Sequence, residues 1–165
     1  VAVTYSPIAT TTLTNTSSSV TFSGIGGTYT DLVAVCNYAI VSNTLSFLTV
    51  TLNSDTSTNY SITDIGGNGT TMFSSRDTNS ATGWLSFNVG CDTIIGTTMS
   101  MINFMNYSNN TTYKTIVSRT NNTGGTQYEG VNLQATLWRS TSAINTITFK
   151  NKTGGIEFNF ASGSS

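Results

Sequence analysis

The stretch VNLQATLWRS, residues 131–140, decides the expected fold, because its residues alternate as those of a β-strand do. Successive side chains of a strand point to opposite faces, so one face here is apolar and the other polar. We expect the apolar row to face the core, and its members are Val131, Leu133, Ala135 and Leu137. Trp138 then falls on the polar side, and Arg139 falls in line with the apolar row, so the pattern inverts where the strand ends.

Short runs of the same kind recur along the chain, separated by clusters of Gly, Asn, Ser and Thr that are typical of turns. No window shows the period of an amphipathic helix, and the Thr, Gly and Asn content disfavours one. The sequence therefore predicts an all-β fold, a single antiparallel β-sandwich domain over residues 1–165. A jelly-roll topology is preferred, although strand order does not follow from the pattern.

Two segments give specific expectations about burial. The segment LTVTLN, residues 48–53, alternates and is predicted to turn Leu48, Val50 and Leu52 inward. The segment 32–41 is apolar on both faces, which is typical of a central strand that is buried on two sides.

Composition excludes several classes of function. Charged residues make up 8% of the 165 residues, the net charge is −1, and the six basic residues are scattered. Nucleic-acid binding rests on clustered Lys and Arg, so we expect no nucleic-acid partner. A nearly neutral surface rich in hydroxyl groups suits static assembly or contact with polyols. No run approaches the ~20 apolar residues of a membrane span, so membrane insertion is not expected.

Catalytic chemistry has little support in the sequence. Histidine is absent, which removes the commonest general base and the commonest transition-metal ligand. The carboxylates are placed by the pattern at strand ends, in turns or on outward strand positions; they are Asp31, Asp55, Asp64, Asp77, Asp92, Glu129 and Glu157. No two of them stand out as the paired acids of a glycosidase. We therefore predict that the chain is not an enzyme and needs no cofactor.

Metal binding has one weak candidate. Asn53, Asp55 and Ser57 alternate as the oxygen ligands of calcium loops do, but the loop lacks the glycine and terminal acid of an EF-hand. The preferred interpretation is an Asn- and Asp-rich turn joining two strands. Cys36 and Cys91 lie outside any CxxC motif, and small buried thiols are preferred over a disulfide bridge.

The two tryptophans and the following arginine are the remaining candidates. Trp84 and Trp138 both lie opposite the apolar row of their own strands. Three interpretations stay open: burial under loops or a neighbouring subunit, a β-bulge that returns them to the core, or an exposed platform for sugar rings. Arg139 is predicted to be a structural clasp, its stem on the core and its guanidinium capping loop carbonyls or reaching solvent.

Several motifs resemble a known family when they are taken in order. They are YSPIATTTL (5–13), VTFSGIGGTYTDLVAV (20–35), LNSDTSTNYS (52–61), MNYSNNTTYKT (105–115) and WRSTSAINTITF (138–149). Together they are similar to a family of virion structural proteins of tailed bacteriophages, common among cyanophages. The family usually continues past the equivalent of residues 160–164 into one more strand, and here that strand is expected to be absent or supplied by a partner.

The resemblance implies a non-enzymatic virion surface protein, in a capsid decoration, head-fibre, tail-fibre or attachment role. Its expected partners are other virion proteins and further copies of itself, a trimer being favoured. The alternative is a glycan-binding module for host recognition that uses the surface aromatics Trp84 and Trp138. The expected location is the virion, assembled in the host cytoplasm.

Overall fold

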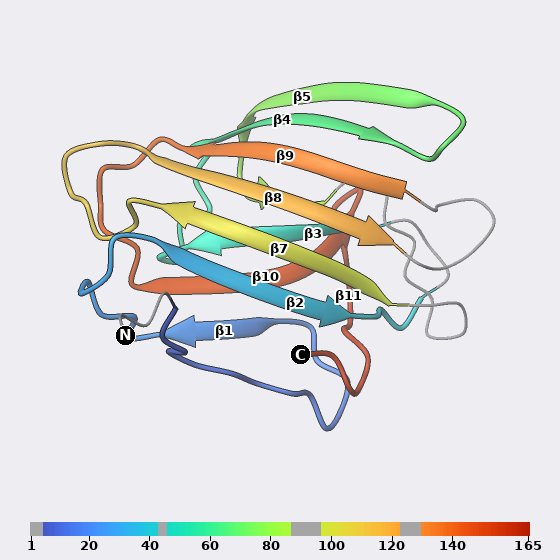
Figure 1. Cartoon of the computed structure of the whole chain (residues 1–165), viewed down its shortest axis with the longest axis horizontal. Coiled ribbons are helices and arrows are strands. Elements are labelled where there is room, and N and C mark those ends of the chain that lie inside the picture. Colours follow the sequence, from blue (N-terminus) through green and yellow to red (C-terminus); the bar gives the residue numbers. More distant parts are fainter. Residues whose placement is uncertain (1–4, 43–45, 87–96, 123–129) are drawn as a thin grey trace.

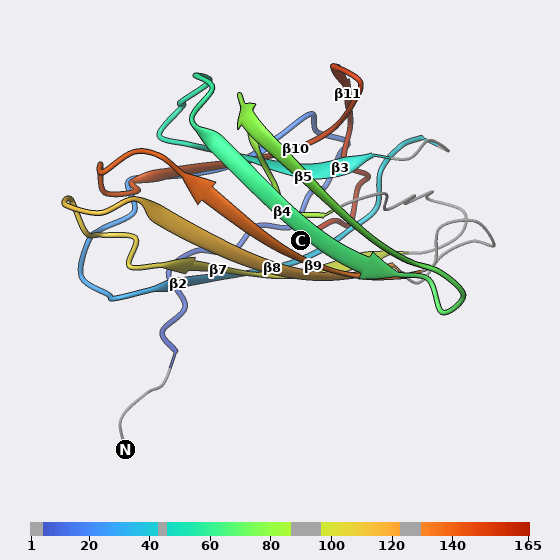
Figure 2. The same ribbon diagram turned by 90° about the horizontal axis from the view of Figure 1, so that it is seen from above.

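The structure is a computed structural model that describes residues 5–42, 46–86, 97–122 and 130–165. Within these residues the chain forms eleven strands in two antiparallel sheets that pack face to face (Figures 1 and 2). The predicted all-β sandwich is therefore confirmed. None of the described segments forms a helix long and apolar enough to cross a membrane.

The smaller sheet has the strand order β1-β10-β3-β6, and β11 pairs with β10 beyond β1. Its strands are β1 (Val20–Ser23), β3 (Phe47–Leu52), β6 (Gly83–Trp84), β10 (Thr146–Thr153) and β11 (Ile156–Phe158).

The larger sheet has the order β2-β7-β8-β9-β4-β5. Its strands are β2 (Leu32–Tyr38), β4 (Tyr60–Gly67), β5 (Met72–Ser80), β7 (Thr98–Met105), β8 (Lys114–Asn122) and β9 (Gly130–Trp138). The prediction of a central strand at residues 32–41 is wrong, because β2 lies at the edge of this sheet. The jelly-roll topology stays a prediction. A jelly roll has eight strands divided between two sheets, whereas the larger sheet of the described chain alone has six.

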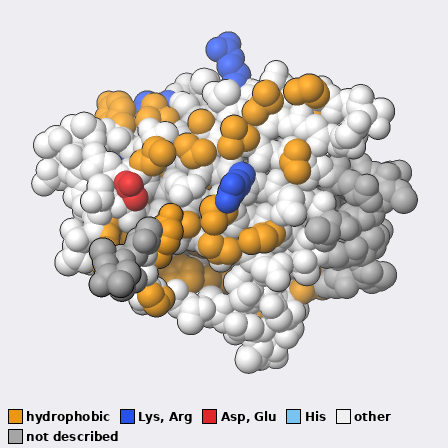
Figure 3. All heavy atoms as spheres, viewed as in Figure 1, with side chains coloured by type: hydrophobic (Ala, Val, Ile, Leu, Met, Phe, Trp, Pro, Cys, Tyr) orange, Lys and Arg blue, Asp and Glu red, His pale blue; other side chains and the backbone are white. Residues whose placement is uncertain are grey.

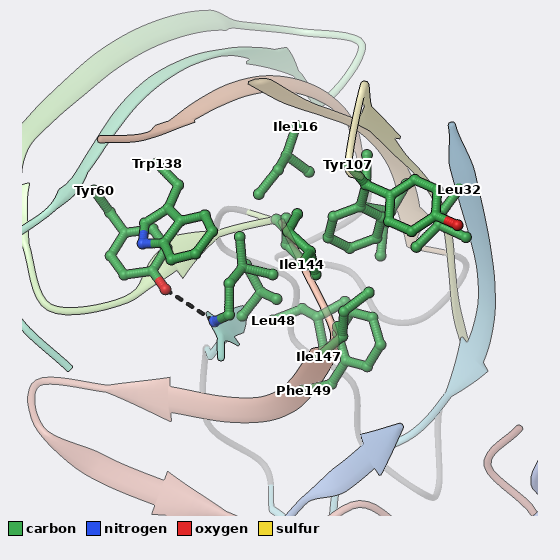
Figure 4. Packing of buried hydrophobic residues seen from close by; sticks show 14 of the residues in the cluster. Leu32, Leu48, Tyr60, Tyr107, Ile116, Trp138, Ile144, Ile147 and Phe149 are labelled. Carbon is green, nitrogen blue, oxygen red and sulfur yellow. Dashed lines mark hydrogen bonds between the residues drawn. The ribbon is translucent and has the colours of Figure 1, made fainter. Parts of the chain in front are cut away.

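The core between the sheets is packed as predicted on the side of β3. Leu48, Val50 and Leu52 are all buried and meet side chains from the larger sheet (Figure 4). Trp138 and Tyr60 lie side by side at one end of this core, their rings stacked at 6.5 Å between centroids. The Tyr60 hydroxyl accepts a hydrogen bond from the Leu52 amide at 2.9 Å, which joins the two sheets.

The orientation predicted for residues 131–137 is wrong. Val131 and Leu133 of the apolar row are 64% and 50% exposed, and Ala135 is exposed beside them. The polar row turns inward instead, and Asn132, Gln134, Thr136 and Trp138 are buried. The register of β9 with both neighbouring strands is continuous, so no bulge causes this inversion.

The polar row of β9 faces inward because of the chain segment that lies beneath it. Of the described residues, the two-residue strand β6 and residues 85–86 run beneath β9 and its neighbour β8, and their main-chain carbonyls need donors from above. Thr136 donates its hydroxyl hydrogen to the Trp84 carbonyl at 2.7 Å, and Ser118 donates to the Leu85 carbonyl at 2.8 Å. The inward hydroxyl groups therefore satisfy a buried backbone that an apolar row would leave without partners.

A close approach of backbone makes this layer possible. A Cβ atom placed on Gly83 would stand 2.9 Å from both the Thr136 Cγ2 and the Val50 Cγ1 atoms. Glycine is therefore required where β6 passes between β3 and β9.

One carboxylate also departs from expectation. Asp64 was expected at an outward or solvated position, but its side chain points inward from β4 and the residue is 1% exposed. Among the described residues neither carboxylate oxygen has a hydrogen-bond partner. Burial raises the pKa of Asp64, although the neighbouring Gln134 and Ser75 side chains act to lower it.

Candidate functional site: the outer face of the six-stranded sheet

The outer face of the six-stranded sheet, the side turned away from the smaller sheet, is the most unusual surface of the described chain (Figure 3). Eight large hydrophobic residues on it are between 36% and 81% exposed; they are Val33, Val35, Ile65, Met72, Met99, Met105, Val131 and Leu133. Scattered single exposed hydrophobic residues are normal in soluble proteins, but a contiguous group marks an interaction surface.

Strand register makes this group contiguous. Directly opposed residues of neighbouring antiparallel strands share a face. One such row crosses five strands, from Val35 on β2 through Met101, Arg119 and Leu133 to Ile65 on β4. The outer face is thus an apolar band along the sheet, interrupted in that row by one basic side chain.

All four methionines of the chain lie on this face. Met99, Met101 and Met105 alternate along β7, and Met72 on β5 is paired with Gly67, in the outward row of β4. Methionine has an unbranched, polarizable side chain that adapts to an irregular partner and is over-represented at protein-binding surfaces. Four methionines gathered on one face therefore favour contact with another macromolecule over plain solvent exposure.

Arg119 gives the band a positive charge near its centre. Its guanidinium Nη2 lies 2.9 Å from the Met101 Sδ atom. The ion pairs within the described residues join Glu157 to Lys150 and Lys152 on the other sheet, so no carboxylate of those segments neutralises Arg119. A partner that covered this band would have to supply an acceptor for the guanidinium.

A shallow hollow lies at the β4 and β5 end of the face. Ile65, Met72, Val131 and Leu133 form its walls, and Gly67 leaves its floor without a side chain. Gly66 cannot carry a side chain either, because a Cβ atom there would lie 2.3 Å from the Asn132 Oδ1 atom on the inner side. The hollow is open and apolar, which suits a protruding aliphatic or aromatic side chain of a partner.

Trp138 is buried within the chain and is 2% exposed. Its indole Nε1 donates a hydrogen bond to the Asp55 Oδ2 atom at 2.7 Å. Trp138 is therefore buried in the core between the two sheets without a bulge in β9, rather than under loops or a neighbouring subunit. An exposed sugar platform is excluded at this residue.

Trp84 is partly buried at the edge of the smaller sheet. Its ring stacks on Phe47 with centroids 4.9 Å apart, and the residue packs against the core cluster. The two tryptophans lie on different sheets, so they do not form a common platform.

The weak metal candidates are held by other bonds. The Asn53 side-chain oxygen accepts from the Asn145 and Thr146 amides, and the Asp55 Oδ1 atom accepts from the Ser57 amide at 2.9 Å. Burial acts to raise the pKa of Asp55, but the bonds from Asn59, Trp138 and Ser57 outweigh it and lower the pKa. No group of three acidic, Cys or His residues suited to a metal ion occurs in the part of the chain that the structure describes.

Arg139 joins the loop before β4, β4 itself and the end of β5 to the end of β9. Its guanidinium donates to the Thr58 carbonyl at 2.6 Å, to the Asn79 Oδ1 atom at 2.8 Å and to the Ser61 hydroxyl. This geometry agrees with the predicted clasp, since the guanidinium caps a loop carbonyl, while the effect on stability stays a prediction.

Cys36 is a free thiol on the inner side of β2, and burial raises its pKa to about 11. Burial therefore favours the protonated form of the thiol, which is a weaker nucleophile than the thiolate. Cys91 lies outside the described residues.

No family model, curated protein or solved structure matches the chain. The geometry of the outer face therefore carries the functional argument.

Sequence reasoning missed this face because Val131 and Leu133 were expected to face the core and residues 32–41 were expected to be buried on two sides. One signal was present: the outward positions of β7 alternate Met99, Met101, Asn103 and Met105, and the inward positions begin with Thr98 and Ser100. Where several neighbouring strands carry hydroxyl residues on the side expected to face solvent, that side can be the one that faces the core.

Proposed function

We propose that this chain is a structural module that acts by protein–protein assembly, docking on another protein of a tailed-phage virion through its outer face. The observation that carries the proposal is the apolar band across the six-stranded sheet, with eight exposed large hydrophobic residues. The resemblance to virion structural proteins supports a place in the virion, and the band supplies a reason for assembly.

The size of the face suits such a role. Six strands at a spacing of ~4.8 Å and some six residues at ~3.3 Å each give roughly 500 Å² in projection. A standard interface buries ~800 Å² of accessible surface on each partner, which is of the same order as the size of this face.

Charge narrows the chemistry of the partner. Arg119 lies within the band on β8. Arg76 is exposed on the same face, opposite Thr63, but lies on the edge strand β5. A partner with aliphatic side chains would match the apolar band, and a carboxylate among them could bind the Arg119 guanidinium. We therefore expect an acidic side chain at the centre of the partner's surface.

Glycan recognition is not proposed as a second function. It rested on exposed tryptophans, and Trp138 is buried while Trp84 packs on Phe47.

The test is competition for incorporation into particles of the virus that encodes the chain. Tagged wild-type chain, Leu133→Glu, Arg119→Glu and Ile156→Glu are expressed during infection and measured in purified particles by mass spectrometry. Ile156 is the matched control, because it is an exposed aliphatic residue on a strand of the other sheet.

We expect wild type and Ile156→Glu in the particles, and Leu133→Glu and Arg119→Glu to be depleted roughly tenfold or more. Absence of the wild-type chain from particles, or equal incorporation of all variants, contradicts the proposal.

A further inference from the structure

The turn between β4 and β5 carries an Asn-Gly pair that assembly through the outer face does not use. The turn consists of residues 68–71, Asn-Gly-Thr-Thr, and projects from one end of the six-stranded sheet (Figure 1). Asn68 is the one asparagine of the sequence that a glycine follows. All four residues of the turn are exposed, so water reaches their side chains and their main chain.

Three donors converge on the side-chain oxygen of Asn68. Its Oδ1 atom accepts from the Thr70 amide at 3.0 Å, from the Thr71 amide at 2.8 Å and from the Thr71 hydroxyl at 3.1 Å. When a nucleophile attacks the carbon of an amide group, negative charge builds up on this oxygen, and fixed donors stabilise that charge. The turn therefore polarises the Asn68 side chain toward attack at its Cγ atom.

The nitrogen that would attack and the nitrogen that would leave are both unhindered. Within the part of the chain that the structure describes, neither the Gly69 main-chain nitrogen nor the Asn68 Nδ2 atom forms a hydrogen bond. Gly69 has a φ of 84°, and no atom lies within 4 Å of the place where a Cβ atom would stand. Because glycine has no side chain, its nitrogen can approach the neighbouring Cγ atom without a clash.

We propose that Asn68 is a site of spontaneous modification, at which the side-chain amide is converted to a carboxylate. The Gly69 nitrogen gives its proton to water or hydroxide and forms a bond to the Asn68 Cγ atom, and the bond from Cγ to Nδ2 breaks, so that ammonia leaves. Water then opens the cyclic imide at either of its carbonyls, which yields aspartate or isoaspartate. The net reaction consumes a water molecule, releases ammonia and needs no oxidant or reductant.

The product would change the charge of a turn that has no charged residue. Gly69 lies in the wall of the apolar hollow, together with Gly67 and Met72. An aspartate at position 68 still accepts hydrogen bonds from the two threonine amides, and its negative charge strengthens them. An isoaspartate also lengthens the main chain between β4 and β5. The chain thus gains a negative charge beside the hollow, whether or not the outer face binds a partner.

A second turn of the chain has the same set of donors and supplies a matched comparison. In residues 109–112, Asn-Asn-Thr-Thr, the Asn109 Oδ1 atom accepts from the amides and the hydroxyls of Thr111 and Thr112. The residue that follows is Asn110, whose side chain restricts the approach of its own nitrogen. The two turns therefore differ in the residue whose nitrogen would attack, and substitution can exchange that difference.

The test follows loss of the side-chain amide by peptide mapping with mass spectrometry, in the folded full-length chain kept at mildly alkaline pH. Wild type is compared with Gly69→Asn, which gives the first turn the sequence of the second, and with Asn110→Gly, which does the reverse. Asparagine accepts a positive φ more readily than most residues with a side chain, so Gly69→Asn keeps the turn. Thermal unfolding checks that both variants are folded.

We expect wild type to lose the Asn68 amide at least about tenfold faster than the Asn109 amide, because glycine leaves the attacking nitrogen unhindered. Gly69→Asn should remove this difference, and Asn110→Gly should raise the rate at Asn109 toward that at Asn68. A free peptide with the sequence of residues 64–75 should react within about tenfold of the folded chain, since no hydrogen bond on either nitrogen has to open first.

Three results overturn the inference. Asn68 keeps its amide in the folded chain, Asn68 and Asn109 react at the same rate, or either substitution leaves the rate in its own turn unchanged. Reaction of the free peptide beside an unchanged folded chain also contradicts it, and means that the turn protects the Asn-Gly pair.

Discussion

Strands β3 and β9 have the same alternating pattern and opposite orientations. In β3 the apolar residues Leu48, Val50 and Leu52 are buried, whereas in β9 the apolar residues Val131 and Leu133 face solvent. Strand periodicity states which residues share a face, and it does not state which face is inside. The difference arises from what lies opposite each strand. Side chains of the larger sheet lie opposite β3, whereas the main-chain carbonyl of Trp84 lies opposite β9 and that of Leu85 lies opposite the neighbouring strand β8.

The largest expected effect comes from truncating one leucine in each strand. Leu52→Ala should lower the free energy of unfolding by about 2–5 kcal/mol, because it leaves a cavity in a buried core. Leu133→Ala should change it by less than about 0.5 kcal/mol, as an exposed site does. Urea denaturation of both variants measures this, and equal losses would show that Leu133 is buried in the folded chain.

Arg139 tests the place where the pattern of β9 inverts. Arg139→Met removes the bonds to the Thr58 carbonyl and the Asn79 side chain and should cost about 1.5–3 kcal/mol in unfolding free energy. Arg139→Lys keeps the positive charge but lacks the planar guanidinium with its several donors, so it should recover only part of the lost unfolding free energy. Wild-type stability in Arg139→Met would mean that the clasp contributes nothing.

The inner row of β9 can be tested without changing side-chain volume. Thr136→Val removes the hydroxyl that donates to the Trp84 carbonyl and leaves this buried acceptor without that bond, at a cost of about 1–2 kcal/mol. Thr63→Val is the matched control, since Thr63 is exposed on the outer row of β4. Thermal unfolding should separate the two, and a loss at Thr63 alone would reverse our assignment of the faces.

The smallest effect concerns Asp64 and pH. Because its pKa is raised above the ordinary 3.8, the folded state binds this proton more tightly than the unfolded state. The resulting stabilisation is complete below pH 3.8 and is lost as the pH rises through the folded-state pKa. Asp64→Asn should therefore gain stability relative to wild type as the pH rises toward 7. A constant difference between the two from pH 4 to 7 would rule out a raised pKa.

Local features of the chain were predictable from sequence. The turn at Asp55 follows from short-range hydrogen bonding by Asp side chains, and the clasp at Arg139 follows from its position at the end of a strand. Their partners were not predictable, because Trp138 meets Asp55 and Arg139 meets Asn79 only after the sandwich closes.

The outer face was not predictable for the same reason. Nothing within residues 130–138 shows that β6 will pass beneath them and need hydroxyl donors. The edge position of β2 was not predictable either. Its two apolar faces indicated a buried central strand, but Val33 and Val35 face solvent on the outer face.

Oxidative footprinting of the four methionines tests the assembly proposal most directly. Met72, Met99, Met101 and Met105 all lie on the outer face, so their oxidation by hydroxyl radicals reports its coverage. Tyr29 and Tyr113 are exposed residues outside the strands and serve as internal references. We predict that oxidation of the methionines falls at least about fivefold between the isolated chain and purified particles, as expected for a desolvated interface, while that of the tyrosines changes less. Equal oxidation of the methionines in both states would contradict assembly through this face.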